Sequence, residues 1–163
     1  MFKVLYWNCR GIGNTPIKMV LLHLIVVYCS DIIFLSEPKI LFDSSISTGV
    51  QPFRFNFSLL NTNGSLWCFC NSSPNLNFSL LDHSNPHFTI KILDLPTSSS
   101  CMITGVYEST DHRLRRNLSD YLVNTSSIAL PWYVIGDFNA IPLVSEKFTP
   151  ALHPPSLSRN LMT

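Results

Sequence analysis

The sequence predicts a mixed α/β domain, and three observations support this prediction. A short apolar strand, a helix and a second apolar strand follow one another within the first 40 residues. This order is typical of two parallel strands joined by a right-handed crossover. Short apolar or alternating segments, separated by turn residues, then occupy the middle of the chain, as in an antiparallel meander. Finally, residues 101–135 combine two further apolar strands with an amphipathic helix between them.

Composition limits the class of protein. The 163 residues suffice for one domain with a sizeable core. Because 46% of them are hydrophobic, the chain can offset the entropy of ordering, and disorder is excluded. A formal net charge of +1 disfavours a polybasic nucleic-acid binder but leaves room for an enzyme that holds nucleic acid weakly and locally. Only 13% of the residues are charged, which indicates poor solubility or an incomplete molecule.

Cysteines and the most apolar segment bear on location. The five cysteines are an odd number and lack C-x-x-C spacing, which disfavours zinc and predicts a reducing, intracellular compartment. Cys68 and Cys70 lie two apart in an apolar run, so we expect them to pack in the core from one face of a strand. The apolar stretch Met19–Cys29 is much shorter than the ~20 residues of a membrane helix, so no membrane association is expected.

The first strand, Phe2–Trp7, ends at the polar Asn8. A turn follows, and a helix is expected to begin at Pro16 with Thr15 as its N-cap and to end near Tyr28. This predicted helix has few polar residues, mainly Lys18 and His23. The next strand is short and apolar and stops at Glu37.

The middle of the chain is expected to form a single antiparallel meander. Asn63-Gly64 lies between two apolar runs, which is the strongest short-range signal for a hairpin. We expect the later elements to be a strand over 101–107, a helix over 111–124 and a strand over 131–135. The meander strands are expected at residues 53–57, 65–70, 78–81 and 88–92.

Polar side chains stand where four of the apolar strands end: Asn8, Glu37, Tyr107, and the pair Asp137 and Asn139. Functional groups of α/β sheets lie where strands end, because the faces of the strands are covered by other elements. We therefore expect all five to converge at one edge of a single sheet. Neighbouring parallel strands are ~4.8 Å apart, so Asn8 and Glu37 are close enough to share one hard cation.

These residue types suit phosphate chemistry. Glu37 is the expected Mg²⁺ ligand, since Mg²⁺ takes only one or two carboxylates and keeps several waters. Asp137 would position the attacking water. Asp137 and Asn139 are two apart, so both would point into one cleft while Phe138 faces the core. Each of these residues, taken alone, has a common structural explanation. A lone Glu is usually on the surface, and a lone Asn after a strand usually forms a turn. The arginines at 113–116 likewise suit a solvated helix face.

The order of the motifs resembles a known family. The series consists of four motifs, in this order along the chain: Trp7-Asn8-Cys9-Arg10-Gly11-Ile12-Gly13-Asn14, Leu35-Ser36-Glu37-Pro38-Lys39, Gly105-Val106-Tyr107 and Gly136-Asp137-Phe138-Asn139-Ala140-Ile141. Together they resemble the endonuclease/exonuclease/phosphatase family, and more narrowly the endonuclease domain of plant LINE-type (non-LTR) retrotransposons. The resemblance is strong over residues 3–39 and 101–147 and loose through the middle of the chain, so 1–147 would be the domain and 148–163 a Pro/Ser-rich tail.

The resemblance implies a DNase I-like α/β sandwich that cleaves DNA with Mg²⁺. Glu37 would bind the metal with Asn8 beside it, Tyr107 would contact the scissile phosphate, Asp137 would orient or activate the water, and Asn139 would support the phosphate. DNA would be the partner, held weakly and locally, and no stable protein partner is implied. If the retrotransposon role holds, the location would be the nucleus.

One departure shapes the remaining expectations. The family has a second half that ends in an Asp-His pair, and no matching pair follows Asp137 here. The sequence therefore predicts an incomplete sandwich, with a first sheet, two helices and a second sheet that is largely missing. Activity would be weak or lost, and open apolar strand faces would allow self-association. Two alternatives are a non-enzymatic remnant of the fold and a phosphatase of the same family that acts on phosphorylated small molecules.

Overall fold

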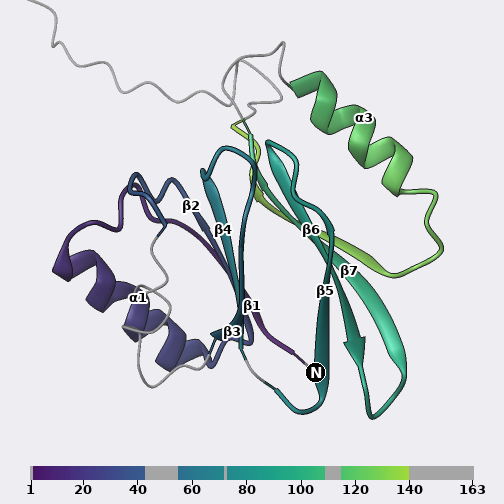
Figure 1. Cartoon of the computed structure of the whole chain (residues 1–163), viewed down its shortest axis with the longest axis horizontal. Coiled ribbons are helices and arrows are strands. Elements are labelled where there is room, and N and C mark those ends of the chain that lie inside the picture. The colour runs from purple at the N-terminus through teal and green to yellow at the C-terminus, as the bar shows by residue number, and fades with distance from the viewer. Residues whose placement is uncertain (1, 43–54, 72, 109–114, 140–163) are drawn as a thin grey trace, which may run out of the picture.

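Two four-stranded sheets packed face to face form the protein, as seen in a computed structural model that describes residues 2–42, 55–71, 73–108 and 115–139 (Figure 1). Helix α1 covers the outer face of the first sheet, and α3 lies beside the second. The α/β sandwich expected from the sequence is confirmed. No helix among the described residues is both long and apolar enough to cross a membrane.

The first sheet has the order β1-β2-β4-β3. Its strands are β1 (Val4–Asn8), β2 (Ile32–Ser36), β4 (Leu66–Asn71) and β3 (Phe55–Leu60). β1 and β2 are parallel, as the βαβ pattern predicts, whereas β2–β4 and β3–β4 are antiparallel. The predicted hairpin joins β3 to β4, with Gly64 at a φ of +70° that suits glycine.

The second sheet has the order β5-β6-β7-β8. β5 (Leu76–Asp82), β6 (His87–Asp94) and β7 (Ser99–Tyr107) are antiparallel to one another, and β8 (Trp132–Asp137) runs parallel to β7. The expectation of a largely missing second sheet is therefore wrong, and so is the single meander. β4 has β2 on one side and β3 on the other, so no edge remains for β5, which starts the second sheet instead.

Helix α1 (Thr15–Tyr28) begins one residue earlier than predicted. Its N-cap is Asn14, whose side chain accepts a hydrogen bond from the Ile17 N–H at 2.9 Å. Thr15 is already helical, so the prediction that it caps the helix is wrong. Asn14 has the extended backbone that places a side-chain oxygen over the first turn. The helix ends at Tyr28, and its C-cap residue, Cys29, has a left-handed φ of 48°.

Helix α3 (Arg115–Thr125) contacts the second sheet at β6, through Tyr121. The predicted start of this helix lies outside the described residues. The ring of Tyr121 stacks on His87 with centroids 3.6 Å apart, and its hydroxyl lies 2.5 Å from the hydroxyl of Thr89. Thr89 in turn bonds Thr104 at 2.8 Å, so hydrogen bonds as well as apolar contacts hold α3 in place.

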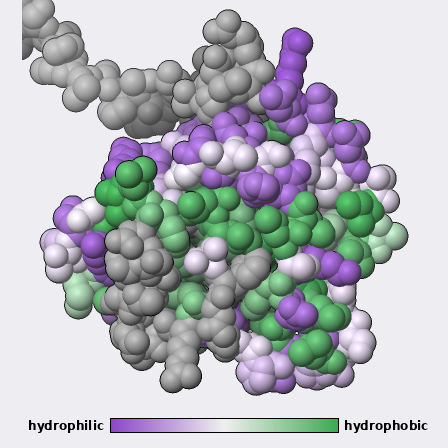
Figure 2. Space-filling view, viewed as in Figure 1, coloured by the Kyte–Doolittle hydropathy of each residue, from purple (hydrophilic) through white to green (hydrophobic). Residues whose placement is uncertain are grey.

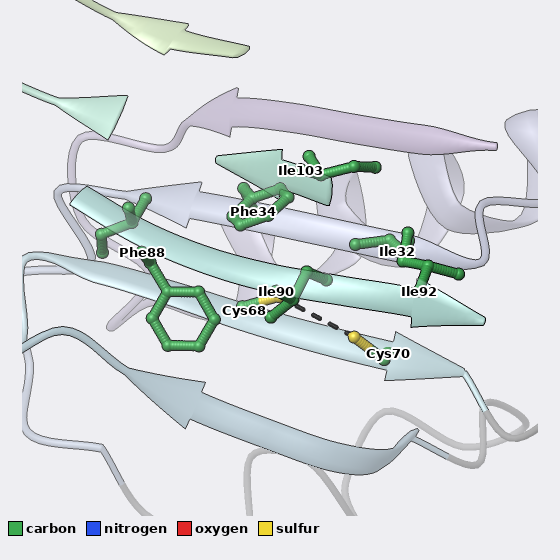
Figure 3. Packing of buried hydrophobic residues seen from close by; sticks show 9 residues of the cluster. Ile32, Phe34, Cys68, Cys70, Phe88, Ile90, Ile92 and Ile103 are labelled. Atoms are coloured by element: carbon green, nitrogen blue, oxygen red, sulfur yellow. Dashed lines mark hydrogen bonds between the residues drawn. The ribbon is translucent and has the colours of Figure 1, made fainter. Parts of the chain in front are cut away.

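The core between the sheets is apolar (Figure 3). Phe34 of β2 and Phe88 of β6 meet edge to face, with ring centroids 6.4 Å apart. Gly105 of β7 leaves room for Phe34, since a Cβ there would lie 2.3 Å from the phenyl ring. Cys68 and Cys70 are fully buried in this core, with their sulfurs 3.9 Å apart, which confirms the packing role expected from their spacing.

A second apolar cluster lies under α1. Leu21 and Ile25 of the helix pack against the outward-facing residues of β2 and β4. Those strands are consequently buried on both faces, which explains why β2 consists of apolar residues up to its final serine. The outward-facing residues of the two strands are Ile33, Leu35, Trp67 and Phe69.

Candidate active site

The carboxyl ends of β1, β2, β7 and β8 meet at one end of the sandwich, at the top of Figure 1. In the same view, Figure 2 is largely hydrophilic near the top and hydrophobic across the middle. The polar residues predicted to converge do so, but the prediction of a single sheet is wrong. Asn8 and Glu37 come from the first sheet, whereas Tyr107 and Asp137 are register partners in the second. Stacked sheets are ~10 Å apart, so side chains from both can reach one another.

Asn8 joins the two sheets. Its Nδ2 donates one hydrogen bond to Glu37 Oε1 at 3.0 Å and another to Asp137 Oδ2 at 3.2 Å. An amide nitrogen has two protons, so both bonds can form at once. The Arg10 N–H donates to Asn8 Oδ1 at 3.3 Å. The amide therefore holds two carboxylates, which would otherwise repel each other, within reach of one small ligand.

Glu37 lies just after β2 with a φ of +51°, an uncommon conformation for a residue other than glycine. Backbone bonds fix it: its N–H donates to Ser65 O at 3.0 Å, and its carbonyl accepts from the Gly11 N–H at 2.8 Å. The hydrogen bond from Asn8 is the main cause that lowers the pKa of Glu37, and Lys39, with its Nζ 3.2 Å from Oε2, adds to the effect. Glu37 is therefore ionised at neutral pH.

Tyr107 is held in the protonated form. Burial, then a hydrogen bond with Glu37 and the negative charges of Glu37 and Asp137, raise its pKa to about 12. The hydroxyl is thus a donor at neutral pH. Beneath it, Tyr6 Oη donates to Val106 O at 2.8 Å and ties β1 to β7. The sequence interpretation missed Tyr6, although its place two residues before Asn8, on the same face of the strand, was an available signal.

Asp137 and Asn139 form a folded-back turn. The Asn139 N–H donates to Asp137 Oδ1 at 3.0 Å, and Asn139 has a φ of +45°. Asn139 Nδ2 donates to Glu108 O at 2.6 Å, so this side chain braces a neighbouring loop. Phe138 is 37% exposed, and the expectation that it faces the core is wrong, because strand geometry ends at Asp137. A phosphate contact by Asn139 stays a prediction.

Two residues next to the site were also missed. Glu108, 2% exposed, donates its backbone N–H to Asp137 O at 2.9 Å. Arg115, the first residue of α3, donates from its guanidinium to Asn139 O at 2.8 Å. The sequence placed the arginines of this helix on a solvated face, which is right for the exposed Arg116 but not for the half-buried Arg115. Arg113 lies outside the described residues. Only the local helical pattern was available, and it says nothing of a loop 24 residues away.

The donor atoms suit a hard cation. Glu37 and Asp137 offer carboxylate oxygens, and within the described segments no group of three or more His, Cys, Asp or Glu gathers to hold a metal. Mg²⁺ takes one or two carboxylates and keeps its waters, whereas zinc prefers Cys and His. The residues therefore fit Mg²⁺, and Lys39, with its Nζ 3.2 Å from Glu37 Oε2, is a cation that would compete with it.

Comparison with solved structures identifies the architecture. No family model and no curated protein matches the sequence. The human Nocturnin catalytic domain with bound sulfate matches with a TM-score of 0.54 over 86% of this chain, at 19% identity. The endonuclease domain of TRAS1, a telomere-specific non-LTR retrotransposon, matches with a TM-score of 0.60 over 86% of the chain, at 14% identity. The chain has the DNase I-like fold.

A mannosyl-6-phosphatase from Bacteroides thetaiotaomicron also matches, with a TM-score of 0.52 over 85% of the chain at 13% identity. The structural neighbours of this DNase I-like chain thus include both nuclease and phosphatase proteins. The chain spans 65%, 62% and 66% of the length of these three structures, respectively.

Proposed function

We propose that the chain hydrolyses phosphodiester bonds in DNA with Mg²⁺, as an endonuclease of the retrotransposon type. The observation that carries this proposal is the pair of carboxylates, Glu37 and Asp137, brought from two different sheets to one amide nitrogen. The likeness of the fold to a retrotransposon endonuclease domain supports the choice of DNA as substrate. The motifs around Asn8 and Asp137, which resemble those of plant LINE elements, support it as well.

Each residue of the site has a role in this proposal. Glu37, with Asn8 beside it, would hold Mg²⁺, which when bound polarises a phosphate oxygen and stabilises charge on the leaving oxygen. Glu37 is kept ionised for this role by Asn8 and Lys39. Tyr107, kept protonated, donates a hydrogen bond to a phosphate oxygen. Asp137, whose two oxygens accept bonds from Asn8 and Asn139, orients the attacking water.

Nicking of supercoiled plasmid with Mg²⁺ tests the proposal. Wild-type protein should convert plasmid to the open-circle form, and a chelator should stop the conversion. Asp137→Ala and Glu37→Gln should each remove the nicking that remains above background. Asp120→Ala is the matched control, because this carboxylate is exposed on α3 and should be dispensable. Nicking that survives in Asp137→Ala would contradict the proposal.

A phosphatase is the second candidate, and the match to the mannosyl-6-phosphatase favours it. The same carboxylates would then act on a phosphate monoester. Release of inorganic phosphate from mannose 6-phosphate, lost in Asp137→Ala and without any plasmid nicking, would establish this alternative. Binding of Mn²⁺ without either activity would instead indicate a non-enzymatic remnant.

A further inference from the structure

Asn139, in the turn that follows β8, makes three hydrogen bonds: one within the turn and two to other segments. The backbone N–H of Asn139 donates to Asp137 Oδ1 at 3.0 Å, and its Nδ2 donates to Glu108 O at 2.6 Å. The third tie comes from the helix: Arg115 Nη2 donates to Asn139 O at 2.8 Å. The backbone N–H, the carbonyl and the side-chain amide nitrogen of this one residue are therefore all bonded.

These hydrogen bonds stabilise an uncommon backbone conformation at Asn139. The φ of Asn139 is +45°, and left-handed conformations are unfavourable for residues other than glycine, although Asn tolerates them best. Such a conformation persists when its surroundings over-determine it. This backbone conformation sets the direction of the Asn139 carbonyl relative to its N–H, so the residue can bond Arg115 through the carbonyl and Asp137 Oδ1 through the N–H at the same time.

Arg115 donates its hydrogen bond to Asn139 O from a helix that is itself held on the second sheet. Helix α3 is fixed on the second sheet by the stacking of Tyr121 on His87 and by the bond of Tyr121 with Thr89. The side chain of Arg115 is itself half-buried. A planar guanidinium has several donors in fixed directions, so little freedom is lost when one of them bonds a carbonyl.

We propose that Arg115 is a positioning residue for Asp137, an inference that rests on the proposed function. Arg115 holds the Asn139 carbonyl, which keeps the Asn139 N–H on Oδ1, while Asn8 from the other sheet holds Oδ2. Both oxygens of the carboxylate are then oriented, and so is the water that it directs. Arg115 acts through Asn139 and does not touch the substrate.

Amide hydrogen exchange tests the structural step without need of activity. In Arg115→Ala, the Asn139 amide should exchange about five to ten times faster, the effect expected when one hydrogen bond is weakened. The Glu108 amide is an internal reference, because its bond to Asp137 O does not involve Arg115. Arg116→Ala, at the exposed neighbouring position, should change neither rate. An unchanged Asn139 rate, or equal acceleration at both amides, would overturn the proposal.

Kinetics test the functional step. Arg115→Ala should lower kcat for nicking about 10–100-fold, as is typical when a partner of a site residue is lost, and leave KM for DNA unchanged. Arg115→Lys should recover part of this loss, since an ammonium can donate to the same carbonyl. A raised KM with unchanged kcat would mean that Arg115 contacts DNA, and would overturn the proposal. If wild-type protein does not nick at all, the proposed function fails, while the exchange experiment still decides the role of Arg115.

Discussion

The α1 side and the α3 side of the sandwich are built by different means. α1 is apolar on most of its surface: Leu21 and Ile25 are buried against the first sheet, yet Met19 and Val26 are 59% and 56% exposed. α3 is mainly polar and is held on the second sheet by one buried leucine and by hydrogen bonds. Those bonds run from Tyr121 through Thr89 and Thr104 to Trp132 Nε1.

This difference matters for the site, which takes residues from both sides. The first sheet, closed by apolar packing on both faces, supplies Asn8 and Glu37. The second sheet supplies Tyr107 and Asp137, and α3 reaches its loops through Arg115. The contact between the sheets decides whether the two halves of the site meet, and the helix contacts decide how firmly each half is held.

The largest effect is expected where the sheets touch. Gly105→Val would place side-chain carbon against the ring of Phe34, since even a Cβ would lie 2.3 Å from it. Overpacking of a core typically costs about 1–3 kcal/mol and sometimes more, and we expect the upper end because both strands are central. Urea unfolding measures the loss.

A compensating change separates overpacking from other causes. In the double variant Gly105→Ala with Phe34→Leu, the smaller side chain makes room, so stability should exceed that of Gly105→Ala alone. If the second change brings no recovery, the close approach of β2 and β7 is not what requires glycine here.

A pair of leucines tests the difference between the helices. Leu21 of α1 and Leu118 of α3 are almost equally buried, at 3% and 4% exposure. Leu21 belongs to the apolar cluster under α1, while Leu118 belongs to neither cluster among the described residues. We expect Leu21→Ala to cost about 3–4 kcal/mol and Leu118→Ala about 2 kcal/mol in the free energy of unfolding, within the usual range for such cavities. Equal losses would contradict the distinction drawn between the two sides.

The smallest expected effect is the contribution of Tyr107 to the pH dependence of the free energy of unfolding. Its folded pKa of about 12 exceeds the ordinary value of 10.0, so between these values the unfolded chain loses this proton while the folded chain keeps it. The resulting stability is present below pH 10 and is lost as the pH rises to 12. Tyr107→Phe should therefore lose stability less steeply than wild type over this range in urea unfolding. The effect is small because the hydroxyl is partly exposed to solvent. Parallel curves for the two proteins would show that Tyr107 is not perturbed.

Elements with strong local signals could be predicted from the sequence. α1 followed from its Pro16 and its apolar run, and the hairpin from Asn63-Gly64. The convergence of Asn8, Glu37 and Asp137 followed from one rule, that polar groups at strand ends share an edge.

Long-range pairing could not be predicted. The antiparallel contact of β2 with β4 divides the middle strands between two sheets, and no local pattern specifies it. The hydrogen bond from Arg115 to Asn139 depends on where α3 docks relative to the loop after β8. The helical pattern alone does not contain this information, and it placed Arg115 on the solvent-exposed face. The left-handed φ of Asn139 likewise arises from contacts with other segments.

We propose that Glu37 and Asp137, from opposite sheets, form one cation site with Asn8 between them. NMR with added Mn²⁺ tests it most directly, because the paramagnetic ion broadens signals of nearby nuclei. The Asn8 side-chain amide and the backbone amides of Glu37 and Asp137 should broaden first and together. Glu37→Gln should raise the Mn²⁺ concentration required, while the control Asp120→Asn should not. Broadening confined to one sheet, or an unchanged titration in Glu37→Gln, would contradict the claim.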